Sequence, residues 1–205
     1  MILTMDSGKD QRTLQERGND GLGIRQGLPE ALQVLVEQYP RDIWQAHEEF
    51  EGLVKFWMER HQMFRKLLGM LDADTAALLN GEMVRDAYLP RLARFGNMFV
   101  SELHMHHNIE DHHFFPALRE KDIRIETGFD LLEGDHEELV IGLDAFTQKA
   151  QGLIAAEAGQ REQCAEAFQT HLTRLHDLID RHLTDEEDLI VPVILKYGAN
   201  EFSHY

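Results

Sequence analysis

Two similar stretches decide the fold that this sequence predicts: "HHNIEDHHFFP" at residues 106–116 and "HLTDEEDLIVP" at residues 182–192. Each begins with a histidine, has a glutamate four residues later and ends in a proline ten residues later. Residues four positions apart lie on one face of an α-helix, about one turn from each other. Each stretch therefore predicts a helix that presents an imidazole and a carboxylate side by side.

The surrounding sequence has the apolar periodicity of helices. Apolar residues recur at alternating steps of three and four in four long segments, which is the pattern of amphipathic helices. These segments cover about 40–71, 90–119, 128–156 and 160–195. The connections near 72–83, 120–127 and 157–160 are short enough for antiparallel neighbours. The sequence therefore predicts an all-α, up-down-up-down four-helix bundle.

The N-terminal part is different in character. Residues 1–27 are polar, contain glycine and lack the apolar core of a signal peptide, so we expect them to form a flexible arm. A short extra helix, opened by Pro29 and closed near Pro40, is expected to pack on the outside of the bundle or cap one end. We assign residues 28–200 to one domain.

Composition excludes several classes of function. The 205-residue chain has a formal net charge of −17, so nucleic acid and anionic membrane surfaces are poor partners. No apolar run approaches about 18 residues, the length that a membrane-spanning helix needs. The single cysteine, Cys164, excludes an internal disulfide and makes a thiolate metal cluster implausible. We expect a cytoplasmic protein.

Polar residues interrupt the apolar stripes at matching places. Inward rows of the four predicted helices contain His61, His106, His136 and His182, together with Glu110 and Glu186. A buried polar group without a partner costs roughly 1–3 kcal/mol, and a buried unpaired carboxylate costs far more. Two carboxylates among four imidazoles are reasonable in a core if bound cations neutralise them.

The chain repeats one unit twice: a helix with a histidine, then a helix with His-x-x-x-Glu. His61 precedes His106 by 45 residues, and His136 precedes His182 by 46. If both glutamates bridge two metal ions, each ion has two histidine nitrogens and two glutamate oxygens. A shared oxo or hydroxo bridge would be a fifth ligand, and an octahedral ion keeps one open position. Nitrogen and oxygen ligands without sulfur suit iron, manganese or zinc.

These residues resemble the hemerythrin-like (HHE cation-binding) family. The matching pieces are "ERHQMFRKLL", "HHNIEDHHFFP", "GDHEELVIGL" and "HLTDEEDLIVP". The resemblance implies a four-helix bundle around a non-haem centre of two iron ions per chain, with a small diatomic molecule or peroxide as partner. The predicted set of four histidines and two glutamates is closest to the repair-of-iron-centres proteins, which are linked to nitrosative and oxidative stress. This chain lacks the additional N-terminal cysteine pair of those proteins.

The sequence departs from the oxygen-carrying members of the family. Those members have a fifth histidine one turn from the first on the third helix, where this chain has Leu132 and Val140. Their last carboxylate lies five residues after the histidine, which makes Glu187 an alternative to Glu186. Glu133 is a further candidate for the missing ligand.

Two other histidines of the first stretch have open roles. His113 could line an access path, hydrogen-bond to a metal-ligating residue, or pack in the core or at the end of the bundle. We expect His107, paired with Asp111, to face a neighbouring helix or solvent.

The sequence leaves two functions from different classes. The first is a binding or sensing module for O2 or NO, or a holder of iron. The second is an oxidoreductase acting on peroxide, O2 or NO, or an iron donor for damaged clusters, and the missing fifth histidine motivates it. A structural zinc site is less suitable, since structural zinc prefers four ligands and often cysteine.

Overall fold

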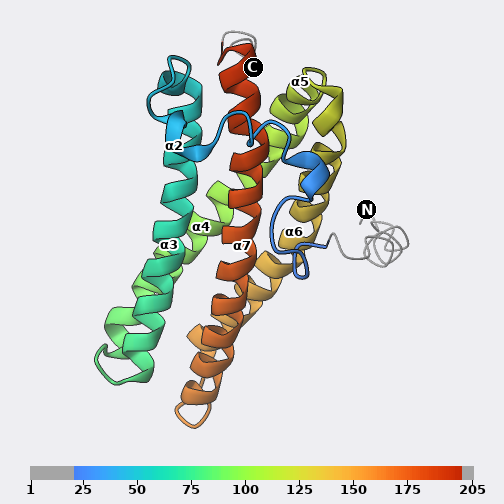
Figure 1. Ribbon diagram of the computed structural model, residues 1–205. Coiled ribbons are helices and arrows are strands. Elements are labelled where there is room, and N and C mark those ends of the chain that lie inside the picture. Colours follow the sequence, from blue (N-terminus) through green and yellow to red (C-terminus); the bar gives the residue numbers. More distant parts are fainter. Residues whose placement is uncertain (1–20, 200–205) are drawn as a thin grey trace, which may run out of the picture.

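A computed structural model describes residues 21–199, and these residues contain helices and no strand (Figure 1). Four long helices form the body: α3 (Lys55–Leu79), α4 (Arg85–Ile109), α6 (Glu126–Ala155) and α7 (Arg161–Tyr197). The contacts run from α3 to α4, α4 to α6, α6 to α7 and α7 back to α3, so the helices close a ring. The predicted four-helix bundle is confirmed.

The first predicted helix, 40–71, is wrong at both ends. Only α2 (Arg41–Trp44) forms near its start, followed by turns and by η3 (Phe50–Val54). Inside η3 the backbone is not helical, and Gly52 has a φ of 86°. A left-handed glycine turns the chain before α3 begins, although the apolar spacing continues across the break. The helix then continues past residue 71 to Leu79.

The second predicted helix, 90–119, begins earlier and is interrupted. Helix α4 already starts at Arg85, with Pro90 inside it, and a π-helical turn, η4 (Glu110–Phe114), separates it from α5 (Phe115–Arg119). Pro116 has no N–H to donate to the preceding turn, which favours an irregular hydrogen-bond pattern just before it. A π turn inserts one residue, so the faces of the helix shift beyond residue 110.

The segment before α2 packs against the bundle. The predicted helix between Pro29 and Pro40 is reduced to a 3-10 turn, η2 (Glu30–Leu32), with further turns after it. Leu28, Leu32 and Leu35 are buried in one cluster with residues of α6 and α7. Residues 1–20 of the predicted arm lie outside the described residues, whereas Leu22 is buried. The domain boundary at residue 28 stays a prediction.

A polar layer divides the core of the bundle into two apolar clusters. One cluster includes Phe64, Phe99, Phe146 and Phe168, and the other includes Trp57, Phe115, Phe129 and Leu189, together with η5 (Ile123–Ile125). The predicted histidines and glutamates lie where the chain passes from one cluster to the other, as His61 does between Trp57 and Phe64. Across residues 21–199, none of the helices combines the length and the apolar character needed to cross a membrane.

Candidate metal centre

The polar layer gathers the predicted site residues into two groups of potential ligands. The nitrogen and oxygen atoms of the first group, from His61, His106, Glu110 and Glu186, lie within 4.8 Å of one another. The second group consists of His107, His136 and His182 and meets the same limit. All of these residues are buried except His106, whose side chain is 9% exposed. The structure therefore brings all six predicted residues into one layer and adds a seventh, His107.

Each glutamate reaches from one histidine pair to the other. Glu110 Oε1 lies 2.9 Å from Nε2 of His106, and its Oε2 lies 3.6 Å from Nε2 of His136. Glu186 Oε1 lies 3.3 Å from Nε2 of His61, and its Oε2 lies 3.5 Å from Nε2 of His182. Each carboxylate thus presents one oxygen to the side of α3 and α4 and the other to the side of α6 and α7.

Of the two positions expected for His107, solvent is wrong and a neighbouring helix is correct, because its buried side chain lies inside the layer and faces α6. Its ring stacks on that of His136, with 3.9 Å between centroids and 9° between planes. Adjacent residues on a helix point about 100° apart, but α4 contacts both α3 and α6. His106 therefore meets His61 of α3 while His107 meets His136 of α6. The adjacent pair "HH" at 106–107 was the signal that sequence reasoning missed.

The atoms facing the centre of the layer lack hydrogen-bond partners. Within the described residues this is true of both ring nitrogens of His107, Nε2 of His136 and His182, both oxygens of Glu110, and Oε2 of Glu186. Buried polar atoms in folded proteins are otherwise almost always paired, and a bound ion is one of the ordinary explanations for exceptions. The orphaned atoms are also nitrogen and oxygen donors of the kind that iron, manganese and zinc accept. The residues present therefore fit a metal site.

Carboxylates behind the histidines orient three of the rings. Nδ1 of His61 lies 3.0 Å from Glu187, Nδ1 of His136 lies 2.7 Å from Asp111, and Nδ1 of His182 lies 3.3 Å from Asp135. Such a contact lets Nδ1 carry the proton and leaves the lone pair of Nε2 available for a metal. The three Nε2 atoms that remain are those that face Glu110 and Glu186.

The alternative ligands lie outside the layer. Glu187 is buried behind His61, where Arg41 and Arg65 each donate to one of its oxygens. Glu133 pairs with Arg119 at 2.6 Å, and its side chain is 40% exposed.

His113 is exposed, so packing in the core is wrong for this residue, and its other open roles stay predictions. The π turn shifts the register beyond Glu110, and Phe114 faces Trp57 in its place.

Burial and neighbouring charges prepare the groups for metal binding. Burial lowers the pKa of His106 to about 3 and holds the pKa of His107 well below its usual range, so both rings are neutral at neutral pH. Burial, reinforced by the charge of Glu186, raises the pKa of Glu110 well above its ordinary value. Burial opposes ionisation of Glu186, but the nearby histidines, His61 above all, lower its pKa. Binding of a cation would therefore release a proton from this pair.

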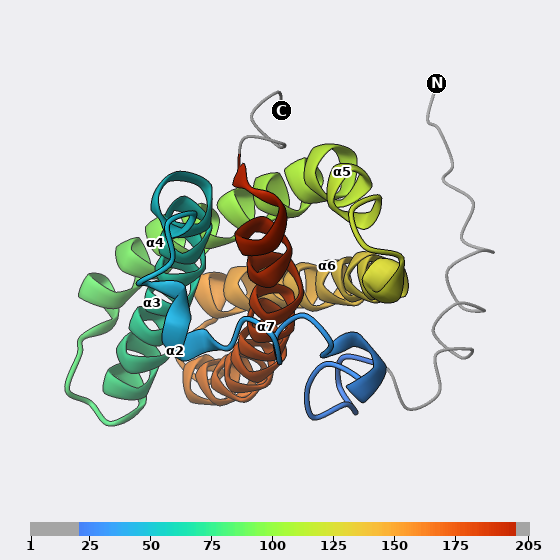
Figure 2. The ribbon, with the colours of Figure 1, turned by 45° about the horizontal axis from the view of Figure 1, so that its top comes forward.

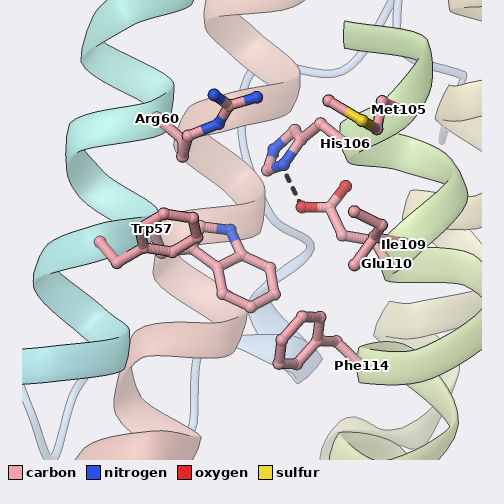
Figure 3. A pocket seen from close by; sticks show the side chains of 8 residues that line it. Trp57, Arg60, Met105, His106, Ile109, Glu110 and Phe114 are labelled. Atoms are coloured by element: carbon pink, nitrogen blue, oxygen red, sulfur yellow. Dashed lines mark ion pairs between the residues drawn. The ribbon is translucent and has the colours of Figure 1, made fainter. Parts of the chain in front are cut away.

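Two residues of the first group, His106 and Glu110, line a small pocket (Figure 3). Its volume is about 220 Å³, and it lies between α3 and α4. Apolar side chains form most of its wall, and the nearly buried His106 and Glu110 also line it. The lining residues are Phe56, Trp57, Arg60, Met105, His106, Ile109, Glu110 and Phe114. The indole N–H of Trp57 donates to Oε1 of Glu186, so this wall also holds one carboxylate in place.

Comparison with known proteins identifies a family for most of the bundle. The family model described as the hemerythrin HHE cation binding domain matches residues 52–194. No curated protein matches the chain, and neither does any solved structure. The matched range contains all seven residues of the layer.

Proposed function

Since the chain belongs to the hemerythrin HHE cation-binding family, we propose that it binds two iron ions in the polar layer and that this pair binds or senses O2 or NO, or holds iron. The observation that carries this proposal is the position of the two glutamates. Each offers one oxygen to either side of the layer, as a carboxylate that bridges two ions must.

The assignment of ligands follows from the two groups. His61 and His106 would hold the first ion, His107, His136 and His182 the second, and Glu110 and Glu186 would bridge them. The first ion then has four protein donors and the second has five. When bound, a ferrous pair supplies electrons that can be shared with a small oxidising ligand. The first ion, which has fewer protein donors, is therefore the one that would bind an added small molecule.

The pocket supports access of a small molecule to the first ion. It is lined by His106 and Glu110, which belong to the four-donor group, and its wall is mainly apolar. An apolar wall excludes water and strengthens the interactions of charged groups inside.

An oxidoreductase acting on peroxide, O2 or NO, or an iron donor, is the second candidate. Its favourable observation is the volume of the pocket, about 220 Å³, which leaves room for more than a diatomic molecule. The missing fifth histidine, which motivated this candidate, is a weaker argument here. His107 adds an imidazole beside His136, on the side where that histidine is missing. Manganese and zinc remain alternative metals, but seven converging donors exceed the four of a typical structural zinc site.

An anaerobic titration of the metal-free protein with iron(II), followed by air, tests the proposal. We expect saturation at two irons per chain and visible charge-transfer absorption after air is admitted. Bands that disappear when the gas is removed support binding, whereas steady consumption of peroxide or NO with a reductant supports the oxidoreductase. Saturation at one iron or none would contradict the proposal. Glu110→Ala should abolish binding of the second iron, and two irons bound as tightly as in the wild type would refute the bridging assignment.

A further inference from the structure

The segment that precedes α2 lies outside the matched family domain and yet crosses it. Both ribbon views place residues 21–40 across α7, from the side of α6 to that of α3 (Figures 1 and 2). Leu22 belongs to the apolar cluster that includes Leu139 and Leu175, and its backbone N–H donates to Glu138 at 3.2 Å. These contacts hold the start of the segment on α6 and α7, beside the second group of ligands.

Arg25 anchors this segment in a buried ionic cluster. Its Nη1 donates to Oδ1 of Asp135 at 2.7 Å, its Nη2 donates to Oδ2 of the same carboxylate, and its Nε donates to Asp185 at 2.8 Å. Arg25 is 8% exposed, and the two aspartates are each 1% exposed. A two-pronged contact between a guanidinium and a carboxylate fixes orientation as well as charge.

Asp135 connects Arg25 to the polar layer. The same Oδ2 that accepts from Arg25 lies 3.3 Å from Nδ1 of His182, whose Nε2 faces Glu186. Partners of this kind set the tautomer and direction of a ligating imidazole, and their loss typically weakens metal binding about 10–100-fold. Arg25 thus fixes the carboxylate that fixes His182.

The equivalent carboxylate on the other side of the layer is held more redundantly. Glu187, behind His61, accepts from Arg65 of α3 at 2.7 Å as well as from Arg41 at 2.8 Å. Arg41 also donates to Asp188 and to the carbonyl of Thr184, and its side chain is 41% exposed. Loss of Arg41 would leave Arg65 in place, so Arg41 offers a matched comparison for Arg25.

We propose that Arg25 is a positioning residue for the ion held by His107, His136 and His182, and that residues 21–28 are a strap that slows release of this ion. This inference rests on the proposed two-metal site. It also assigns a role to a part of the chain that the family domain does not contain. The pocket opens on the other group, so the two ions should differ in how readily they leave.

Release of iron(II) from the loaded full-length chain to a colorimetric chelator, under anaerobic conditions, tests this proposal. For Arg25→Met we expect one of the two irons to leave about 10–100-fold faster than in the wild type, with the other unchanged. Arg25→Lys should restore only part of the retention. Lysine keeps the positive charge, but its ammonium cannot make the two-pronged contact. Arg41→Met should leave both release rates within about threefold of the wild type.

A second variant guards against simple unfolding. Arg25→Met leaves two buried carboxylates without their guanidinium, which can destabilise the whole fold. Arg25→Met with Asp185→Asn removes one of these charges and keeps Asp135 and His182, and circular dichroism reports its folding. Two irons released at wild-type rates from either folded variant would overturn the role of Arg25. Fewer than two irons in the wild type would overturn the two-metal site first, and the strap with it.

Discussion

At the scale of single residues, the inward position of His107 changes the account of the site most. Its ring has no hydrogen-bond partner among the described residues and lies beside His136 and His182. His107→Ala should therefore weaken binding of the second ion at least about tenfold while the first ion still binds. An iron titration measures both affinities. His113→Ala, at an exposed position six residues further on, should bind as the wild type does, and equal affinities for all three proteins would contradict the assignment.

The lowered pKa of Glu187 predicts how acid changes the stability of the folded protein. Burial opposes its ionisation, but hydrogen bonds from His61 and Arg65 outweigh burial and lower its pKa from 4.5 to about 2. A carboxylate with a lowered pKa stabilises the folded state above its unfolded pKa, and this contribution disappears as pH falls from about 4.5 to about 2.

Thermal unfolding of the metal-free protein at pH 5 and pH 3 measures this contribution. Glu187→Gln should have a lower Tm than the wild type at pH 5 and lose less of it on going to pH 3. If both proteins lose the same number of degrees, Glu187 does not carry the effect.

The sequence predicts individual residues well where one helix face meets the core. The inward rows identified His61, His136 and His182 as core positions, and each is buried. The same method did not place His107 in the layer, because it assumes one inward face per helix and α4 has two neighbours. It failed for His113, because a π turn leaves no trace in apolar spacing.

At the scale of helices, the packing of α6 against α7 depends on small residues. A Cβ added to Gly128 would lie 2.7 Å from Cδ1 of Leu189, and one added to Gly142 would lie 2.9 Å from Cδ1 of Leu175. At both positions the side chain of α7 occupies the space that a methyl group would need. The two helices therefore approach closely on both sides of the polar layer.

Gly128→Ala should destabilise the protein even though alanine favours helices. Overpacking against Leu189 costs roughly 1–3 kcal/mol, which exceeds the 0.5–1 kcal/mol or so gained in helix propensity. We expect Tm to fall by about 2–4 °C per kcal/mol of net loss. Gly152→Ala, in the same helix with nothing within 4 Å of the added Cβ, should raise Tm. A rise in Tm for both variants would show that the side chain of Leu189 moves aside at little cost.

The sequence predicts that the long helices exist, but it does not predict where they are interrupted. The last two helices lie within about two residues of their predicted ends, since their apolar stripes are regular and their connections are short. The interruptions at Gly52 and at the π turn arise from backbone geometry that the apolar spacing does not record.

At the scale of the whole molecule, the pocket between α3 and α4 should govern how fast a small ligand arrives. Ile109 lines it and is 39% exposed, so a larger side chain fits there without disturbing the core. Ile109→Trp should slow association of NO with the iron-loaded protein by about tenfold or more, with two irons still bound. Stopped-flow spectroscopy measures the rate.

Ile123→Trp supplies the control for this experiment. Ile123 is 81% exposed and does not line the pocket, so the substitution should leave NO association unchanged. Unchanged association in Ile109→Trp as well would mean that ligands enter by another route.

The polar layer has a consequence for how the molecule unfolds. Because it separates two apolar clusters, we expect each cluster to stabilise its own half of the bundle in the metal-free chain. Ions that join side chains from all four helices would link these halves into one cooperative unit. Metal binding at this buried site would then determine whether the protein unfolds in one cooperative transition or in two steps.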